Sequence, residues 1–398
     1  MTEERKAPSI RFKKFSGQNA EAWEQRKLGD VGETKSGVGF PDSEQGGMVG
    51  VPFYKVSDMN NIGNEIEMVT SNNYVTQAQI VSRKWKVIDN VPAIMFAKVG
   101  AALLLNRKRL IREPFLIDNN TMVYIPSAYW DIMFCKILFD TLNLSKYSQV
   151  GALPSYNGSD IEAIHVFLPT LPEQTAIGSF FQELDQLITL QQRNLEKSRR
   201  IKKAMLQKMF PENKQTVPAI RFKEFSGQNA EAWEQRKLEE CTEISAGGDI
   251  DKSKLLNKGK YPVIANALTN DGIIGYYNDS YRIEAPAVTV TGRGNVGVAK
   301  ARNVSFTPVV RLLSLKSEYD VIFLENAINI QNIVIESTGV PQLTVPQLGS
   351  YKIFFPTPPE QRDIGSFFQD LDKFIALQQR RLDKLLNLKK ALLEQMMM

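Results

Sequence analysis

The organisation of the chain rests on the stretch PEQTAIGSFFQELDQLITLQQRNLEKSRRIKKAMLQKM, residues 172–209. A second copy begins with Pro359-Glu360-Gln361 and continues to the end of the sequence. In both copies apolar residues recur at alternating steps of four and three, the spacing of one face of a helix. The proline and glutamate at the start suit a helix N-terminus. Each copy is therefore predicted to form one long helix.

The apolar steps form a heptad seam along each predicted helix. Gln191 and Gln378 take matching inward positions, where a polar residue costs stability but fixes the register. Lys202 and Lys389 follow in the seam, so we expect the seam to be weak there, with fraying or a partner contact. The other predicted seam residues are Leu184, Ile188, Leu195, Met205, Leu371, Ile375, Leu382, Leu385 and Leu392.

The length of the two helices suggests a rod. About 37 residues, each rising 1.5 Å, span roughly 55 Å. Such a helix is marginally stable alone in water, so we expect the two copies to pack on each other. Two copies of one unit tend to be related by a pseudo-two-fold axis, which makes the helices antiparallel with one globular head at each end. The two ends of the chain are then expected to lie close together.

A second repeat frames the first. Residues 8–28, PSIRFKKFSGQNAEAWEQRKL, return as residues 218–238 with only two substitutions. The tryptophan in each copy is interpreted first as a docking residue and second as a ligand contact. The inserts that follow, residues 29–167 and 239–354, look unlike each other. Repeated frames around divergent inserts predict one scaffold that presents two different heads.

Both inserts are predicted to be mixed α/β domains of one fold. Helical spacing occurs at 130–144 in the first insert and at 323–333 in the second. Strand-like runs occur at 51–56, 93–97, 121–125, 261–264, 272–277, 287–291 and 309–313. The predicted organisation is two recognition domains, residues 1–168 and 213–355, and two spacer helices, residues 169–212 and 356–398.

Composition limits the function classes. No apolar run reaches the length of a membrane span. Cys135 and Cys241 are the only cysteines, so a reduced, cytoplasmic protein without structural disulfides is the simplest interpretation. His165, the single histidine, lies in an apolar run and is interpreted as a strand residue, which argues against a zinc site. The sequence contains no Walker A, H-E-x-x-H or Asn-Pro-Pro-Tyr-like motif.

Two duplicated motifs carry a family resemblance. One is Trp-Glu-Gln-Arg-Lys-Leu at 23–28 and 233–238, and the other leads from a proline through Glu-Gln to Ile-Gly-Ser-Phe-Phe at 169–181 and 356–368. With their alternation around two inserts, the chain resembles the DNA-specificity (S) subunit of type I restriction–modification systems over essentially its whole length. The resemblance implies two target-recognition domains, each reading half of a split DNA site, and an antiparallel coiled coil that sets their spacing.

The resemblance also implies a non-catalytic role and a set of partners. These are double-stranded DNA, two adenine-N6 methyltransferase subunits and ATP-driven motor–nuclease subunits. The cofactors S-adenosylmethionine, ATP and Mg²⁺ are then held by those partners, and none by this chain.

A glycine-rich loop supplies the main alternative. Gly292-Arg293-Gly294-Asn295-Val296-Gly297 is a literal G-x-G-x-x-G after a strand-like run. A dinucleotide site needs a helix next, whereas residues 298–307 are short, mixed and followed by Pro308. The preferred interpretation is a tight loop that presents Arg293 and Asn295. A nucleotide-dependent enzyme using this loop, and a structural coiled-coil adaptor without a DNA role, are the alternatives.

Basic residues near turns are the predicted DNA contacts. Arg293 and Lys98 lead, because arginine commonly reads guanine and both residue types bind phosphate. A solvated loop charge is nearly as good an interpretation of each. The two basic clusters, at 106–109 and 300–303, are interpreted as phosphate anchors or as solvated faces. Two equivalent stretches just before the predicted long helices, Ser155-Tyr156-Asn157 and Gln342-Leu343-Thr344, could reach DNA or could cap and turn the chain. The full predicted set is Lys98, Asn106, Arg107, Lys108, Arg109, Tyr156, Asn157, Arg293, Asn295, Lys300 and Arg302.

Overall fold

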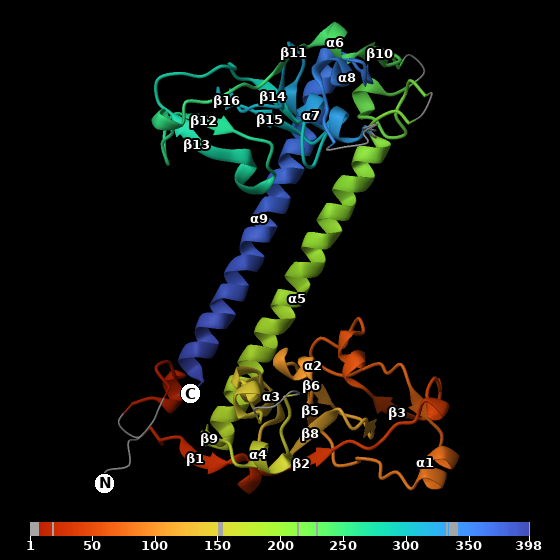
Figure 1. Ribbon diagram of the computed structural model, residues 1–398, viewed down its shortest axis with the longest axis vertical. Helices are drawn as coiled ribbons and strands as arrows, with labels where there is room; N and C mark the ends of the chain where they lie inside the picture. Colours follow the sequence, from red (N-terminus) through yellow and green to blue (C-terminus); the bar gives the residue numbers. More distant parts are fainter. Residues whose placement is uncertain are drawn as a thin grey trace. The chain divides into compact units, whose positions relative to one another are not determined.

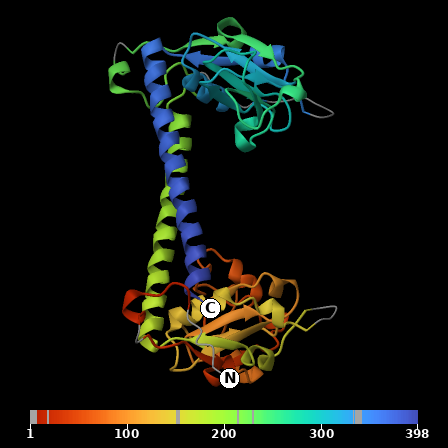
Figure 2. The ribbon, with the colours of Figure 1, turned by 90° about the vertical axis from the view of Figure 1, so that its left-hand side faces the viewer.

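The computed structural model describes residues 8–17, 20–149, 154–212, 215–227, 230–331, 333 and 341–397 (Figures 1 and 2). The chain divides into two compact units: unit 1 comprises residues 1–190 and 382–398, and unit 2 comprises residues 191–381. Each unit holds one insert, together with part of α5 (Leu171–Lys208) and part of α9 (Pro358–Met396). The long helices are therefore shared between the units.

Unit 1 is built on a four-stranded antiparallel sheet in the order β2-β8-β5-β6. A smaller sheet, β4-β3-β7, packs on one face in a cluster that includes Met95 and Val123. The opposite face carries α3 (Ile132–Thr141), whose Phe139 ring lies 4.9 Å from that of Tyr124. The strands are β2 (Gly32–Ser36), β3 (Val51–Tyr54), β4 (Tyr74–Val75), β5 (Ala93–Ala97), β6 (Lys108–Ile111), β7 (Leu116–Ile117) and β8 (Thr121–Pro126).

Unit 2 has the same strand order, β11-β17-β14-β15 in the large sheet and β13-β12-β16 in the small one. α7 (Val321–Asn329) covers one face, where Phe323 packs with Val288 and Leu315. The small sheet packs on the other face through Ile264. The strands are β11 (Glu243–Ala246), β12 (Tyr261–Ile264), β13 (Ile273–Tyr277), β14 (Ala287–Thr291), β15 (Ala299–Arg302), β16 (Thr307–Pro308) and β17 (Leu312–Lys316).

The two inserts thus share one mixed α/β fold, as the sequence predicts. In each small sheet, one of the two strand pairings is parallel: β3 with β7 in unit 1, and β12 with β16 in unit 2. The other pairings between the named strands are antiparallel. Shorter helices are α2 (Ala101–Leu104) and α4 (Gly158–Glu162) in unit 1, and α6 (Leu238–Cys241) and α8 (Val345–Gly349) in unit 2. No helix in the described ranges is long and apolar enough to cross a membrane.

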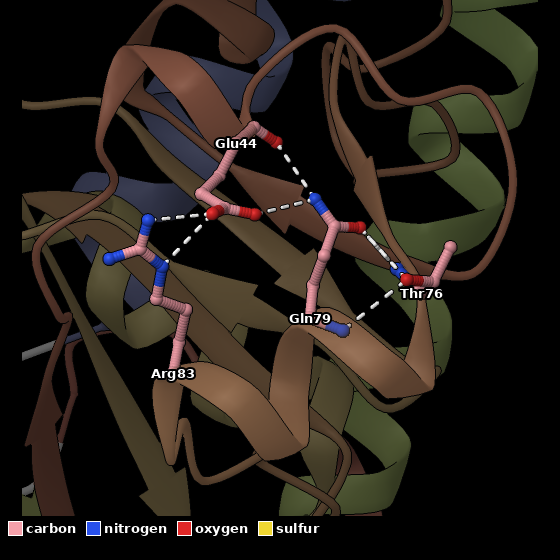
Figure 3. A network of polar contacts seen from close by, with 4 residues as sticks. All are labelled: Glu44, Thr76, Gln79 and Arg83. Atoms are coloured by element: carbon pink, nitrogen blue, oxygen red, sulfur yellow. Dashed lines mark hydrogen bonds and ion pairs between the residues drawn. The ribbon is translucent and has the colours of Figure 1, made fainter.

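Unit 1 also contains α1 (Gln77–Arg83), which is held by the polar network in Figure 3. The Thr76 hydroxyl accepts a hydrogen bond from the Gln79 N–H at 3.4 Å and caps the helix. Gln79 Nε2 donates to Glu44 Oε2 at 2.8 Å, and Arg83 Nη2 donates to Glu44 Oε1 at 2.7 Å. These donors, Gln79 first, hold the pKa of the Glu44 carboxyl below its usual range. The network ties the loop around Glu44 to α1.

Several predicted element bounds are corrected. The helix predicted at 323–333 spans Val321–Asn329. The strand predicted at 309–313 begins only at Leu312, because Arg311 has a φ of +72° and lies in a turn. The helix predicted at 130–144 is shorter, since the Asp131 carboxylate caps its first turn by accepting from the N–H groups of Met133 and Phe134, both at 3.0 Å.

The Trp-Glu-Gln-Arg-Lys-Leu motif forms an antiparallel strand pair in each unit. In unit 1 the motif forms β1 (Glu24–Lys27), which pairs with β9 (His165–Leu168). In unit 2 it forms β10 (Glu234–Lys237), which pairs with β18 (Lys352–Phe355). His165 lies in a strand, as predicted, with an exposed side chain.

The tryptophan of each motif is buried and packs edge-on against the α3 or α7 helix. Trp23 lies 5.9 Å from Phe134, and Trp233 lies 5.9 Å from Phe323, measured between ring centroids. Both tryptophans are therefore docking residues, which was the preferred interpretation of the sequence.

The arginine of each Ile-Arg-Phe sequence anchors the first turn of a long helix. Arg11 binds both carboxylate oxygens of Glu173 at 2.6 Å, and Arg221 binds those of Glu360 at 2.6 and 2.7 Å. Both glutamate side chains are 0% exposed, so each charge is buried with one bidentate partner. The short repeat thus locks the N-terminal frame of each unit to its helix.

The glycine of each Ile-Gly-Ser sequence permits a close approach. A Cβ atom at Gly178 would lie 2.6 Å from Asp131 Oδ1, and one at Gly365 would lie 2.2 Å from Asp320 Oδ1. These aspartates cap α3 and α7. Only glycine lets the long helix pass so near the start of the domain helix.

In each unit, α5 and α9 lie side by side (Figures 1 and 2). In unit 2, Gln191 Nε2 donates to the Gln378 backbone oxygen at 3.2 Å, and Lys202 lies 2.5 Å from Asp372. A later residue of α5 thus pairs with an earlier residue of α9, so the two helices run antiparallel. The predicted seam residues are all buried or half-buried: Leu184, Ile188, Gln191, Leu195 and Met205 on α5, and Leu371, Ile375, Gln378, Leu382, Leu385 and Leu392 on α9.

The expectation of fraying at the seam lysines is corrected, because both helices continue past them. The Lys202 ammonium pairs with Asp372 and the Lys389 ammonium pairs with Asp185, both at 2.5 Å between nitrogen and oxygen. The lysines are half-buried and each has a carboxylate from the other helix. Each lysine therefore adds a polar cross-link to the seam.

The two ends of the described chain lie close together, as expected. The Ile10 N–H donates to the Gln395 backbone oxygen of α9 at 3.0 Å. The equivalent Ile220 N–H donates to the Lys208 oxygen of α5 at 2.8 Å. Each short repeat thus meets the C-terminal end of a long helix.

Candidate nucleic-acid interface

In unit 1 the loop that follows β5 lies beside the segment that precedes α4. The Lys98 N–H donates to the Asn120 oxygen at 2.9 Å, and the Tyr156 N–H donates to the Lys98 oxygen at 3.3 Å. Val99 and Ser155 form an isolated bridge. Backbone hydrogen bonds therefore fix the position of this loop on a rigid sheet.

In unit 2 the glycine-rich loop takes the same place. The Leu343 N–H donates to the Gly292 oxygen at 2.9 Å, and Arg293 bridges Gln342. Gly294 has a φ of +74°, close to the +77° of Gly100. The contacts show which residues correspond: Lys98 with Gly292, Val99 with Arg293, Ser155 with Gln342, Tyr156 with Leu343, and Asn157 with Thr344.

This correspondence refines the leading pair of candidates. Lys98 and Arg293 were each the first choice in their own domain, and they differ by one position in the shared framework. Arg293 and Asn295 are exposed, and Lys98 is half-buried. Arginine and asparagine side chains at an exposed loop tip have the donors that guanine and adenine edges accept.

The glycine-rich loop is not a dinucleotide site. It connects β14 to β15, which pair antiparallel, so no helix follows the strand. The Gly297 N–H donates to the Thr291 oxygen at 2.8 Å, and the Val298 N–H donates to Thr291 Oγ1 at 3.0 Å. The loop is a closed hairpin turn, and the nucleotide-dependent enzyme reading is therefore not supported.

Three predicted DNA contacts are turned inward. The Lys108 side chain is buried, and its ammonium donates to the Leu142 oxygen at 2.6 Å. The Tyr156 hydroxyl donates to the Ala97 oxygen, and this side chain is also buried. Asn106, with a φ of +52°, donates to the Leu142 oxygen at 3.0 Å and accepts from the Leu144 N–H. These three are removed from the set because their polar groups are used inside unit 1.

The two arginines of the first basic cluster are both half-buried. Arg107 donates to Asn60 Oδ1. Arg109 Nη1 donates to the Lys108 oxygen at 2.9 Å, and burial, followed by the charge of Arg107, lowers the pKa of Arg109. Arg107 is half-buried with its exposed part available to a phosphate.

The second basic cluster borders a hollow of about 200 Å³ between the two sheets of unit 2. Arg302 Nε donates to Thr289 Oγ1 at 3.0 Å and Nη2 donates to the Asp271 oxygen at 3.0 Å, and burial lowers its pKa. The exposed Lys300 pairs with Asp271 at 3.1 Å. Arg302 is therefore held as a structural group, whereas Lys300 can exchange its partner for a phosphate.

Asn157 is exposed and stands at the start of α4, where its N–H donates to Asp160 Oδ2 at 2.8 Å. The sequence interpretation left DNA contact and chain capping open, and the structure adds a capping role. Gln342, which the sequence interpretation also left open between DNA contact and capping, is exposed and bridges Arg293. Arg311 was missed as a candidate. Arg311 was hidden because the apolar run at 309–313 looked like a strand, whereas Arg311 lies in a turn beside the loop. A turn signal at Pro308 was the available clue.

Comparison with known proteins agrees with this architecture. The family model of the type I restriction modification DNA specificity domain matches residues 20–198 and 230–387. A Mycoplasma pneumoniae protein named as a type I specificity subunit, S.MpnORF507P, is 25% identical over 228 residues, which cover 56% of this chain and 59% of that protein. The MjaIX specificity subunit of Methanocaldococcus jannaschii is 27% identical over 192 residues, which cover 47% of this chain and 43% of that protein.

A solved structure supports the fold over the full length. The type I restriction–modification S subunit from M. genitalium superposes with a TM-score of 0.63 at 13% identity, covering 99% of each chain. The family model matches well over half of the chain in two blocks, and each block contains one insert and most of one long helix. The chain therefore belongs to the type I restriction modification DNA specificity domain family.

Proposed function

We propose that this chain is the non-catalytic DNA-specificity subunit of a type I restriction–modification complex, and that each unit reads one half of an asymmetric, bipartite target. The observation that carries the proposal is one fold used twice with different chemistry at the same place. The loop presents the half-buried Val99 with Ser155 in unit 1 and the exposed Arg293 with Gln342 in unit 2. A shared framework with different donors predicts two unlike half-sites.

The proposed contacts divide into two kinds. Arg293, Asn295 and Gln342 are proposed to reach base edges. Lys98, Arg107, Arg109, Asn157, Lys300 and Arg311 are proposed to bind phosphates or to position the loops. Contacts of the second kind carry affinity and salt dependence but little sequence information.

The helix pair is proposed to set the number of base pairs between the half-sites. α5 and α9 contain 38 and 39 residues, so each rises about 57 Å, which equals about 17 base pairs of B-DNA. Lys202 with Asp372 and Lys389 with Asp185 fix the register of the pair. Lengthening both helices by one turn should lengthen the unread gap and leave both half-sites unchanged.

The near-identical frames favour two copies of one partner. Residues 8–28 and 218–238 differ at only two positions. Within them, Glu24 and Gln25, and equally Glu234 and Gln235, are exposed on β1 and β10. We propose that these frames receive two adenine-N6 methyltransferase subunits and that motor–nuclease subunits join for cleavage. S-adenosylmethionine, ATP and Mg²⁺ then act in those partners, and the complex works in the cytoplasm.

The test is to sequence N6-methyladenine in DNA from cells that express this chain with its methyltransferase. An asymmetric target with two constant half-sites and a constant unread gap supports the proposal. Methylation without a fixed gap, or methylation that is the same without this chain, would refute it.

A further inference from the structure

Unit 1 contains a hollow of about 630 Å³ where the end of β2, the segment that follows α1 and the short strand β7 meet. Lys35, Lys84 and Lys86 line it, and none of the described residues in the lining carries a carboxylate. Three positive charges around one concave surface attract an anion.

The ammonium groups of this hollow are available to a ligand. Lys84 and Lys86 are exposed, and neither side chain has a hydrogen bond or an ion pair within the described ranges. Lys35 pairs with Glu33 at 3.0 Å, but the two side chains are 39% and 54% exposed, so solvent weakens this pair. All three lysines can therefore turn towards an incoming anion.

The backbone fixes where Lys84 starts. Its N–H donates to the Val81 oxygen at 3.2 Å, and its φ of +55° ends α1. The preceding residue, Arg83, is tied to Glu44 (Figure 3). The lysine is thus held at the rim of the hollow by a rigid helix end.

Unit 2 has a hollow of about 280 Å³ at the corresponding place. The correspondence follows from strand pairing beside each hollow. Ile88 exchanges two backbone hydrogen bonds with Phe115 in unit 1, and Ile283 does the same with Phe306 in unit 2. The two hollows can therefore be compared residue by residue.

The hollow of unit 2 carries no net charge. Its lining holds Glu243 and Glu284 against Arg282 and Lys316. Lys316 pairs with Glu284 at 2.8 Å, and Arg282 Nη2 donates to the Asp249 oxygen. The cations of unit 2 are thus used within the unit, whereas those of unit 1 are not.

Backbone donors differ in the same direction. In unit 2 the Arg282 N–H donates to the Phe306 oxygen at 3.1 Å. In unit 1 neither the corresponding Val87 N–H nor the Lys86 N–H donates a hydrogen bond to any residue that the structure describes. Backbone N–H groups and lysines are both common donors to phosphate oxygens. Unit 1 therefore offers both kinds of donor in one hollow.

The hollow lies at the same edge of the large sheet as the proposed DNA-reading loop. The Gly37 N–H, at the end of β2, donates to the Thr121 oxygen at 3.2 Å, and the Lys98 N–H donates to the neighbouring Asn120 oxygen at 2.9 Å. Only β8 separates β2 from β5, so the two strand ends lie about 10 Å apart. That distance equals roughly three base pairs, so a duplex read at the loop also passes the hollow.

We propose that this hollow binds a phosphate of the DNA backbone beside the half-site read by unit 1, and that unit 2 has no such anchor. Lys84 and Lys86 are the main donors, with Lys35 and the free N–H groups around them. The contact carries affinity and salt dependence without sequence information, so unit 1 holds the duplex more firmly than unit 2 at this place. The inference rests on the proposed function in taking the ligand to be DNA.

The test measures DNA binding by the complex of the full-length chain with its methyltransferase, over a range of salt concentrations. For Lys84→Gln/Lys86→Gln, the plot of log K against log salt should become shallower by about 0.9, the value for one phosphate contact. A target duplex and a random-sequence duplex should show the same change, because the contact reads no base.

Two double variants are the controls. Lys84→Arg/Lys86→Arg keeps both charges and should restore the slope. Lys252→Gln/Lys258→Gln removes two exposed lysines from unit 2 and should leave the slope unchanged. A slope for Lys84→Gln/Lys86→Gln equal to that of wild type, or a change matched by the variant in unit 2, would overturn the inference.

A second measurement locates the contact and identifies the source of the phosphate. The complex is acetylated with sulfosuccinimidyl acetate, and each lysine is followed by mass spectrometry. Duplex DNA should slow the modification of Lys84 and Lys86 severalfold relative to Lys258, whereas inorganic phosphate at equal ionic strength should not. Equal protection by inorganic phosphate, or no protection by DNA, would overturn the inference.

Methylation mapping separates this inference from the proposed function. A complex that methylates a bipartite target, while the slope of Lys84→Gln/Lys86→Gln equals that of wild type, refutes the phosphate site alone. A complex that shows the slope change and the lysine protection on random-sequence duplex, but methylates no bipartite target, refutes the proposed function alone.

Discussion

Arg293 occupies in unit 2 the position that Val99 occupies in unit 1. Each forms an isolated bridge with the residue three places before the start of a short helix, Gln342 for Arg293 and Ser155 for Val99. The backbone is thus repeated while the side chain changes from a bidentate donor to an apolar surface. The recognition chemistry of the two units differs at one defined point of one fold.

Arg293→Ala should weaken or relax recognition of one half-site by about 1–3 kcal/mol and leave the other half-site unchanged. The measurement is methylation of a DNA library in which each half-site is randomised in turn. Lys258→Ala, which removes a positive charge from an exposed position in unit 2, is the control. Full retention of the sequence preference by Arg293→Ala would remove Arg293 from the reading site.

Burial of Lys108 predicts a pH dependence of stability. Desolvation lowers the pKa of this ammonium from 10.5 to about 8. Between those values the unfolded chain keeps the proton that the folded chain has released, so the free energy of unfolding rises with pH. Lys108→Met abolishes this rise, which amounts to at most about 3 kcal/mol.

The check on Lys108 is denaturant unfolding of wild type and variant across this pH range. The stability of wild type relative to Lys108→Met should increase as the pH rises. Lys146→Met, at an exposed site in the same unit, should show no such trend. A difference between wild type and Lys108→Met that is constant with pH would mean that Lys108 stays charged in the folded chain.

The long helices show which structural features the sequence alone can predict. Periodicity identified which residues of α5 and α9 turn inward, including Gln191 and Gln378, because one face of a helix is a local property. It misjudged Lys202, because the carboxylate that neutralises it, Asp372, belongs to a distant part of the chain. Local patterns show which side is buried, while the partners of buried polar groups depend on tertiary contacts.

The candidate site shows the same limit. The repeated frame revealed two heads, and the strand runs such as β5 and β14 were found correctly. Lys108 and Tyr156 were nevertheless assigned to the surface, since a basic or aromatic residue near a turn gives no sign of its direction.

The seam lysines should contribute modestly to stability. A double-mutant cycle replaces Lys202, Asp372 and both residues in turn. The coupling free energy between them should be about 0.3–1 kcal/mol, because the pair is partly exposed. The equivalent pair Lys389 and Asp185 should give a similar coupling. Thermal or denaturant unfolding provides the measurement, and a coupling near zero at low salt would exclude a register role for these pairs.

The buried anchors at the starts of the helices should matter far more. Arg221→Met leaves the Glu360 carboxylate buried without its partner, and the expected loss is about 3–5 kcal/mol. Arg236→Met breaks the exposed pair with Glu234 and should cost much less, because solvent screens that pair. Equal losses in denaturant unfolding would contradict the view that the short repeat locks the frame to the helix.

The central claim is that two independent heads of one fold read two half-sites. The most direct measurement replaces residues 29–167 with the corresponding insert of a relative and maps N6-methyladenine in cells that also express the methyltransferase. The account predicts a new sequence in one half-site, with the other half-site and the gap unchanged. A change in both half-sites, or in neither, would contradict it.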